Sequence, residues 1–232
     1  DNNKKNYQSI LCGYTSEDLS LDMKVFPTNC EGEFSAEYLS QKFGESKLTA
    51  TGKESHFDVN DLNLMQHFCL NDNEQFLELG MKGSSVPARF NATFLYKVKS
   101  CKNNSYTTNI ASGATSCEYP PRYRHWGHGC LGNDFETTVH VRNTSHKPYE
   151  TKDGKAKMII YCKDNKIEHE FKIKAESSVV LKLSDIISRD NSHFYHNDNF
   201  FSWFMEFDIS NCDSQWVSYR KTDGAIFGDH SF

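Results

Sequence analysis

Long apolar runs are missing from this 232-residue chain. No stretch approaches the run of about 18 apolar residues that a membrane-spanning helix needs. Proline is scarce, with 5 residues, and none of the cysteines forms a CxxC pair. The patterns G-x-S-x-G, HExxH, G-x-G-x-x-G and the P-loop are absent as well. We therefore expect no membrane span and no cofactor, and we predict that the protein is not an enzyme.

A cluster of lysine or arginine interleaved with aromatic residues is also missing, which argues against nucleic acid as a partner. The net charge of −5 is unevenly distributed. Residues 1–80 contain 6 Lys, no Arg and 14 Asp or Glu, so they carry 6 − 14 = −8 and the remainder carries +3. Such asymmetry favours a basic protein ligand, and an ordinary solvated surface is the alternative explanation.

Eight cysteines and three N-x-S/T sequons indicate an oxidising compartment. An even number of scattered cysteines suits up to four disulfides, and eight buried thiols in a cytosolic protein are the alternative. Together with the sequons they favour a secreted glycoprotein, and a start at Asp1 without Met fits the removal of a signal peptide. The cysteines are Cys12, Cys30, Cys69, Cys101, Cys117, Cys130, Cys162 and Cys212. The candidate glycosylation sites are Asn91, Asn103 and Asn143.

The clearest structural pattern lies between Lys157 and Lys174. From residue 167 to 174 apolar residues or histidine alternate with Glu and Lys, which is the period of a strand with one buried and one solvated face. A short apolar run, 158–162, precedes this segment. Asp164 and Asn165 lie between the two, and both residue types are common in turns. The pattern predicts an antiparallel β-hairpin.

Similar short patterns recur along the chain. We predict strands at 19–26, 47–51, 75–81, 92–101, 135–141, 179–183, 201–209 and 215–219, with 34–43 ambiguous between strand and helix. Residues 58–69 have the three- to four-residue apolar spacing of a short helix. Residues 102–133 lack periodicity and are predicted to form a long loop. The expected fold is an all-β, disulfide-stabilised antiparallel β-sandwich with one short helix and long loops. We expect a single domain over 1–232, with two β-domains, 1–116 and 117–232, as the alternative.

The best candidate binding segment lies within this long region. Tyrosine, arginine and tryptophan are enriched at binding hot spots, and the segment 119–126 concentrates them. The candidate binding residues are Tyr119, Arg122, Tyr123, Arg124 and Trp126. The alternative is that Trp126 and the tyrosines fill the core beneath a loop.

A second pattern in the same segment, His125-x-x-His128-x-Cys130, combines residue types that bind zinc. Zinc motifs usually supply a second close ligand pair, which is absent, and a disulfide-bonded Cys130 binds no metal. We therefore predict no metal site. The run 126–130 also resembles one active-site segment of T2-type ribonucleases. The earlier histidine segment of that family is missing, and acid–base cleavage needs two poised groups, so we reject this function.

The N-terminal third resembles the secreted poxvirus immune-evasion proteins, a β-sandwich family of chemokine- and cytokine-binding decoys. The resemblance rests on LSLDMKVFPTNC at 19–30, on Leu48-Thr49-Ala50 and on FDVNDLNLMQHFC at 57–69. It implies a soluble decoy that sequesters a host immune protein. We therefore predict a secreted glycoprotein that binds an extracellular protein ligand. An extracellular hydrolase with an unrecognised site and an adhesion or ectodomain module are the alternatives.

Overall fold

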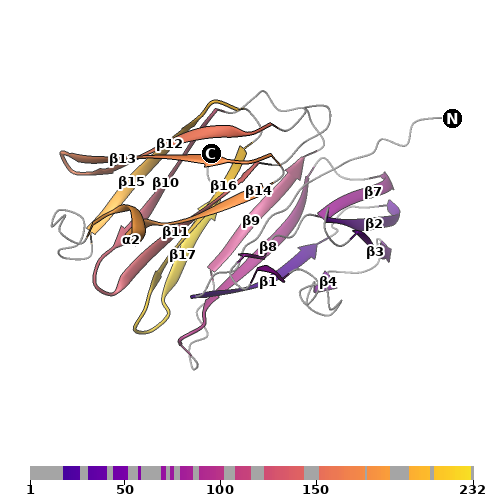
Figure 1. Cartoon of the computed structure of the whole chain (residues 1–232). Helices are drawn as coiled ribbons and strands as arrows, with labels where there is room; N and C mark the ends of the chain where they lie inside the picture. The colour runs from indigo at the N-terminus through magenta and orange to yellow at the C-terminus, as the bar shows by residue number, and fades with distance from the viewer. Residues whose placement is uncertain are drawn as a thin grey trace. The chain divides into compact units, whose positions relative to one another are not determined.

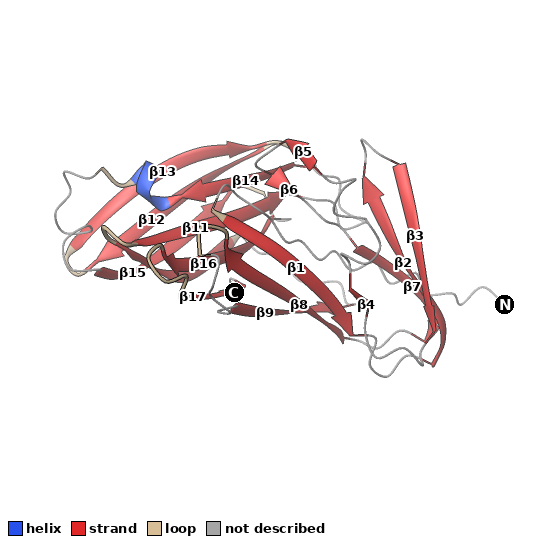
Figure 2. Cartoon of the chain, turned by 90° about the horizontal axis from the view of Figure 1, so that it is seen from below, coloured by secondary structure: helices blue, strands red, loops and turns tan. Residues whose placement is uncertain are grey.

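A computed structural model of the chain provides the structure. It describes residues 18–26, 31–40, 44–51, 57–58, 69–71, 74–75, 79–85, 89–101, 108–115, 123–143, 152–175, 177–188, 199–209 and 212–230. Nearly all of these residues lie in β-strands, which confirms the all-β class (Figure 2). No helix among them is long and apolar enough to cross a membrane.

The chain divides into two compact units. The first comprises Asp1–Tyr96 and Ile110–Glu118, and the second comprises Lys97–Asn109 and Tyr119–Phe232. The single-domain expectation and its two-domain alternative both stay predictions.

The described strands of the N-terminal half form three small sheets (Figures 1 and 2). One sheet has the order β4-β1-β8-β9, and the others are β3-β2-β7 and the pair β5-β6. Strand β2 pairs antiparallel with both β3 and β7. The bounds are β1 Leu19–Phe26, β2 Glu31–Ser40, β3 Gly44–Thr51, β4 Phe57–Asp58, β5 Cys69–Asn71, β6 Glu74–Gln75, β7 Leu79–Ser85, β8 Arg89–Val98 and β9 Thr108–Thr115.

The second unit contains two four-stranded antiparallel sheets, β10-β15-β12-β13 and β14-β11-β16-β17 (Figure 1). A short helix, α2 (Leu183–Ile186), follows β14. The strand bounds are β10 Arg124–Leu131, β11 Phe135–Asn143, β12 Gly154–Cys162, β13 Asn165–Ile173, β14 Ser177–Lys182, β15 Asn199–Phe207, β16 Cys212–Arg220 and β17 Ile226–His230.

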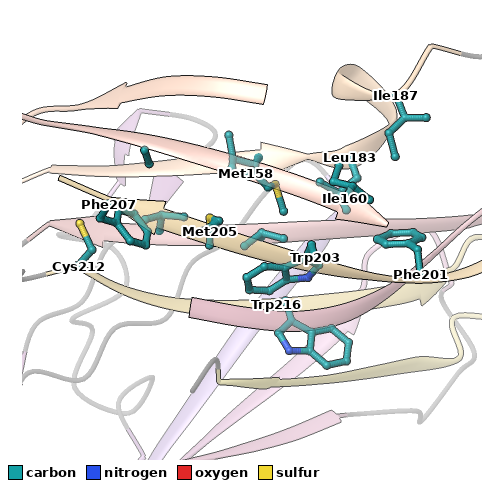
Figure 3. Close-up of a cluster of buried hydrophobic side chains, with 14 of the residues drawn as sticks. Met158, Ile160, Leu183, Ile187, Phe201, Trp203, Met205, Phe207, Cys212 and Trp216 are labelled. Carbon is teal, nitrogen blue, oxygen red and sulfur yellow. The ribbon is translucent and has the colours of Figure 1, made fainter. Parts of the chain in front are cut away.

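Both sheets of this unit contribute side chains to one hydrophobic cluster (Figure 3). Met158, Ile160 and Trp203 come from the first sheet, and Val139 and Trp216 come from the second. All five are at most 7% exposed. Because burial of apolar area is the main favourable term in folding, this cluster is the principal source of stability in the second unit.

The predicted hairpin at 157–174 is confirmed as β12 and β13. On β13, Glu168 and Glu170 are exposed, whereas Phe171 packs against the hydrophobic cluster and Ile173 is 1% exposed. The turn begins one residue earlier than the sequence suggested, because Cys162 pairs with Asn165 and leaves Lys163 and Asp164 between them. Lys163 has a φ of 53°, in the left-handed region.

The two faces of β13 should differ in how much a charge substitution destabilises the protein. Phe171→Asp places a carboxylate against the hydrophobic cluster and should lower the free energy of unfolding by about 2–3 kcal/mol. Glu170→Lys changes an exposed position and should alter it by less than about 0.5 kcal/mol. Urea denaturation of both variants checks the assignment, and equal destabilisation would contradict it.

The predicted long loop at 102–133 was wrong. It contains β9 and β10, and Trp126 lies in β10, where it is 46% exposed and not part of the core. The alternation of β10 escapes detection because its inward positions include Gly127 and Gly129 instead of large apolar residues. A Cβ atom at Gly127 would overlap the Trp203 ring and lie 2.8 Å from Trp216 Cδ1. The bulk on this side of β10 therefore comes from its neighbours.

This close packing makes Gly127→Ala a specific prediction. The new methyl group forces the Trp203 ring to move, so we expect a loss of about 1–3 kcal/mol of stability. Combining it with Trp203→Leu, which removes the overlapping ring, should cost less than the sum of the two single changes. A double-mutant cycle measured by thermal or urea unfolding tests this coupling. Strict additivity would contradict the proposed contact.

Two further expectations concern the helix and the disulfides. Residues 59–68 of the predicted helix lie outside the described residues. Of the eight cysteines, the structure describes the side chains of four, and no disulfide joins any of these to another. Cys162 and Cys212 lie at opposite ends of the second unit's core. Cys162 is the last residue of β12, whereas Cys212 closely follows Ile209 in the chain. The Ile209 side chain lies against Gly154, at the start of β12. That separation exceeds the reach of a disulfide.

Candidate functional site

Three of the five predicted binding residues lie in the described part of the chain. Tyr123 precedes β10 and is 49% exposed, and Arg124 and Trp126 are exposed on the outer face of β10. Tyr119 and Arg122 lie outside the described residues. The arrangement differs from the predicted loop, because a strand fixes Arg124 and Trp126 in register with β15.

The antiparallel register places Trp126 in a row of apolar residues across three strands. Trp126 pairs with Phe204 of β15, and Phe204 pairs with Ile159 of β12. On the same face, Tyr161 lies two positions beyond Ile159 and is 43% exposed. Phe200 lies four positions before Phe204, on the far side of Ser202, and is 72% exposed. We call these five residues, Trp126, Ile159, Tyr161, Phe200 and Phe204, the aromatic face. Sequence reasoning found only Trp126, because the other members come from strands far away in the chain.

Charged residues border the aromatic face on the outer side of the same sheet. The Arg124 Nε atom lies 3.3 Å from Glu206 Oε1. Glu168 forms ion pairs with Lys157 and Lys166. The Lys157 ammonium and the hydrogen bond it donates, together with Lys166, lower the pKa of Glu168, and Glu168 in turn raises the pKa of Lys157. These pairs are solvent-exposed, so they contribute little to stability, and they form a polar rim around an apolar centre.

The two histidines of the His125-x-x-His128 pattern do not come together. His125 is buried on the inner face of β10, where its Nδ1 atom shares a hydrogen bond of 2.8 Å with Ser214 Oγ. His128 is exposed on the outer face, and its Nδ1 atom lies 3.1 Å from Ser202 Oγ. Side chains an odd number of positions apart on a strand point to opposite faces, so the two imidazoles cannot share one metal ion.

Of the three predicted glycosylation sites, the structure describes the side chain of Asn143. Asn103 lies outside the described residues, as does the side chain of Asn91 in β8. Asn143 is fully buried at the end of β11. Its Nδ2 atom donates hydrogen bonds to the carbonyl oxygens of Lys152, at 2.9 Å, and Lys174, at 3.0 Å. This amide nitrogen is the atom to which a glycan would be attached, so the geometry argues against Asn143 as an acceptor.

Asn143 therefore yields a prediction that separates it from the other sequons. Peptide mapping of the folded protein should find residue 143 without a sugar. Asn143→Ala should lower stability by about 1–3 kcal/mol, because it leaves two carbonyl groups without their donor. A glycan detected on residue 143 in protein that unfolds cooperatively would contradict the buried assignment.

No protein-family model matches the chain, and no curated protein matches it either.

Proposed function

We propose that the protein is a secreted, glycosylated binding protein that engages an extracellular protein ligand through the aromatic face. In this proposal the second unit is a β-sandwich with the core of Figure 3 between its two sheets. Any disulfide that stabilises the protein includes at least one of Cys12, Cys30, Cys69 and Cys117, since the other four cysteines form no disulfide with one another.

The observation that carries the proposal is the exposure of large aromatic side chains on one face of a sheet. Trp126, Tyr161 and Phe200 are 46%, 43% and 72% exposed and lie on neighbouring strands. Exposed apolar side chains that gather on one face of a soluble protein are typical of a binding site, whereas single ones are common everywhere. An aromatic centre inside a rim of charged pairs is the usual anatomy of a protein–protein interface. A rigid strand framework also limits the entropy that is lost on binding.

The charge distribution indicates the chemistry of the ligand. The ion pairs beside the aromatic face carry both signs, whereas residues 1–80 carry −8. A basic ligand would therefore be attracted over long range, and its association rate would fall with rising salt. The resemblance of the N-terminal third to immune-evasion decoys adds cytokines and chemokines as the ligand class to test first.

The test is capture of immobilised cytokines and chemokines by the wild-type protein and by Trp126→Ala/Tyr161→Ala. We expect the double variant to bind at least tenfold more weakly, or about 1.4 kcal/mol. Its melting temperature should stay near that of the wild type, because both side chains are about half exposed. Lys155→Ala, an exposed change elsewhere on β12, is the matched control and should bind normally.

Two outcomes would contradict this function. Equal capture by the double variant and the wild type would place the interface elsewhere. Turnover of a bound substrate, instead of stable one-to-one capture, would favour the hydrolase alternative.

A further inference from the structure

A polar pocket lies at the end of the second unit where the β10–β11 turn is found, and none of its lining residues belongs to the aromatic face. Its volume is about 360 Å³, at the small end of the range typical of ligand sites. The β10–β11 turn, the start of α2 and the β16–β17 turn surround it. Its lining side chains are polar or charged: Asn133, Glu136, Lys182, Ser184, Asp185 and Lys221.

Glu136 is the central feature of this pocket. Its side chain is fully buried, which is rare for a carboxylate unless every oxygen has a partner. The Oε1 atom accepts hydrogen bonds from the backbone N–H groups of Thr137 and Ser184, each at 3.1 Å. The Oε2 atom accepts no hydrogen bond, and its nearest cation, Lys221 Nζ, lies 3.7 Å away. The pocket therefore contains a buried acceptor and a neighbouring donor that form an ion pair but no hydrogen bond.

The walls of the pocket are held in place before any ligand arrives. Asp134 joins the two turns, because its backbone carbonyl accepts from Lys221 N at 2.8 Å and its carboxylate accepts from Thr222 N and Oγ1. Arg220 and Asp223 form an ion pair within the β16–β17 turn. The Arg220 guanidinium, with a backbone hydrogen bond from Ala225, lowers the pKa of Asp223 to about 2. A site whose groups are already ordered loses less entropy on binding.

The charges of the pocket limit what it can bind. Lys182 and Lys221 balance Glu136 and Asp185, so the lining has no net formal charge. A polyphosphate or a multivalent cation would leave half of these groups opposed to it. Hydroxyl groups fit better, because each one both donates and accepts a hydrogen bond.

We propose that this pocket binds one sugar residue through two adjacent hydroxyl groups. One hydroxyl donates to Glu136 Oε2, and its neighbour accepts from Lys221 Nζ. Asn133 and Ser184 supply further polar contacts at the pocket wall. This carbohydrate site is independent of the aromatic face and of the protein ligand proposed for it.

The experiment titrates the full chain with the methyl glycosides of glucose, galactose, mannose and N-acetylglucosamine, followed by amide chemical shifts. We expect at least one glycoside to shift the resonances of the two turns and of α2, with a dissociation constant on the order of 1 mM. Glu136→Gln and Lys221→Met should each weaken this binding at least tenfold. Lys172→Met, the same chemical change at an exposed position on β13, should leave it unchanged.

Three outcomes would contradict the proposed sugar site. Shifts that persist unchanged in Lys221→Met, a response to glycine but to no glycoside, or no response at all would overturn the proposal. Lys221 is 45% exposed, so its substitution keeps the test valid even if Glu136→Gln fails to fold. Glycoside binding by Trp126→Ala/Tyr161→Ala should equal that of the wild type, which separates this test from that of the protein ligand.

Discussion

The packing of the second unit depends on the Trp203 ring, which fills the space beside Gly127. The ring lies where a side chain at position 127 would project, and Trp216 from the other sheet approaches the same point. The indole Nε1 atom of Trp203 also donates to the carbonyl oxygen of His128 at 3.1 Å, which fixes the ring against β10. A strand with larger inward residues could not lie this close to both tryptophans. The pairing of β10 with β15, and hence the aromatic face, follows from this steric constraint.

The elements that sequence predicted well are those whose own residues show a period of two. The hairpin of β12 and β13 was predicted because Glu168 and Glu170 alternate with apolar residues. Strand β10 was missed because the apolar bulk on its inner side belongs to β15, which lies about seventy residues later in the chain. Strand β17 was also missed, because it is short and its partner β16 determines its conformation. Local periodicity cannot report packing that another segment provides.

The candidate sites also combine residues that a local pattern reveals with residues that distant segments supply. Composition alone drew attention to Arg124 and Trp126, since arginine and tryptophan are typical of binding surfaces. Tyr161 joins Trp126 only through the register of three strands, which no local pattern encodes. The Glu136 pocket is still less visible, because two turns and α2 form it. The sequon at Asn143 shows the reverse case, since a motif typical of a surface lies at a buried strand end.

The glycines of β10 also determine which positions of this strand can change without disturbing the core. Because its inward positions 127 and 129 carry no side chain, β10 adds little of its own volume to the core at these points. Its exposed positions 124, 126 and 128 can therefore accept new side chains without any compensating change among the buried residues. Mutations on this strand fall into two classes, those that destabilise the fold and those that change only an exposed face. A strand of this kind lets its exposed face change in sequence while the core stays the same.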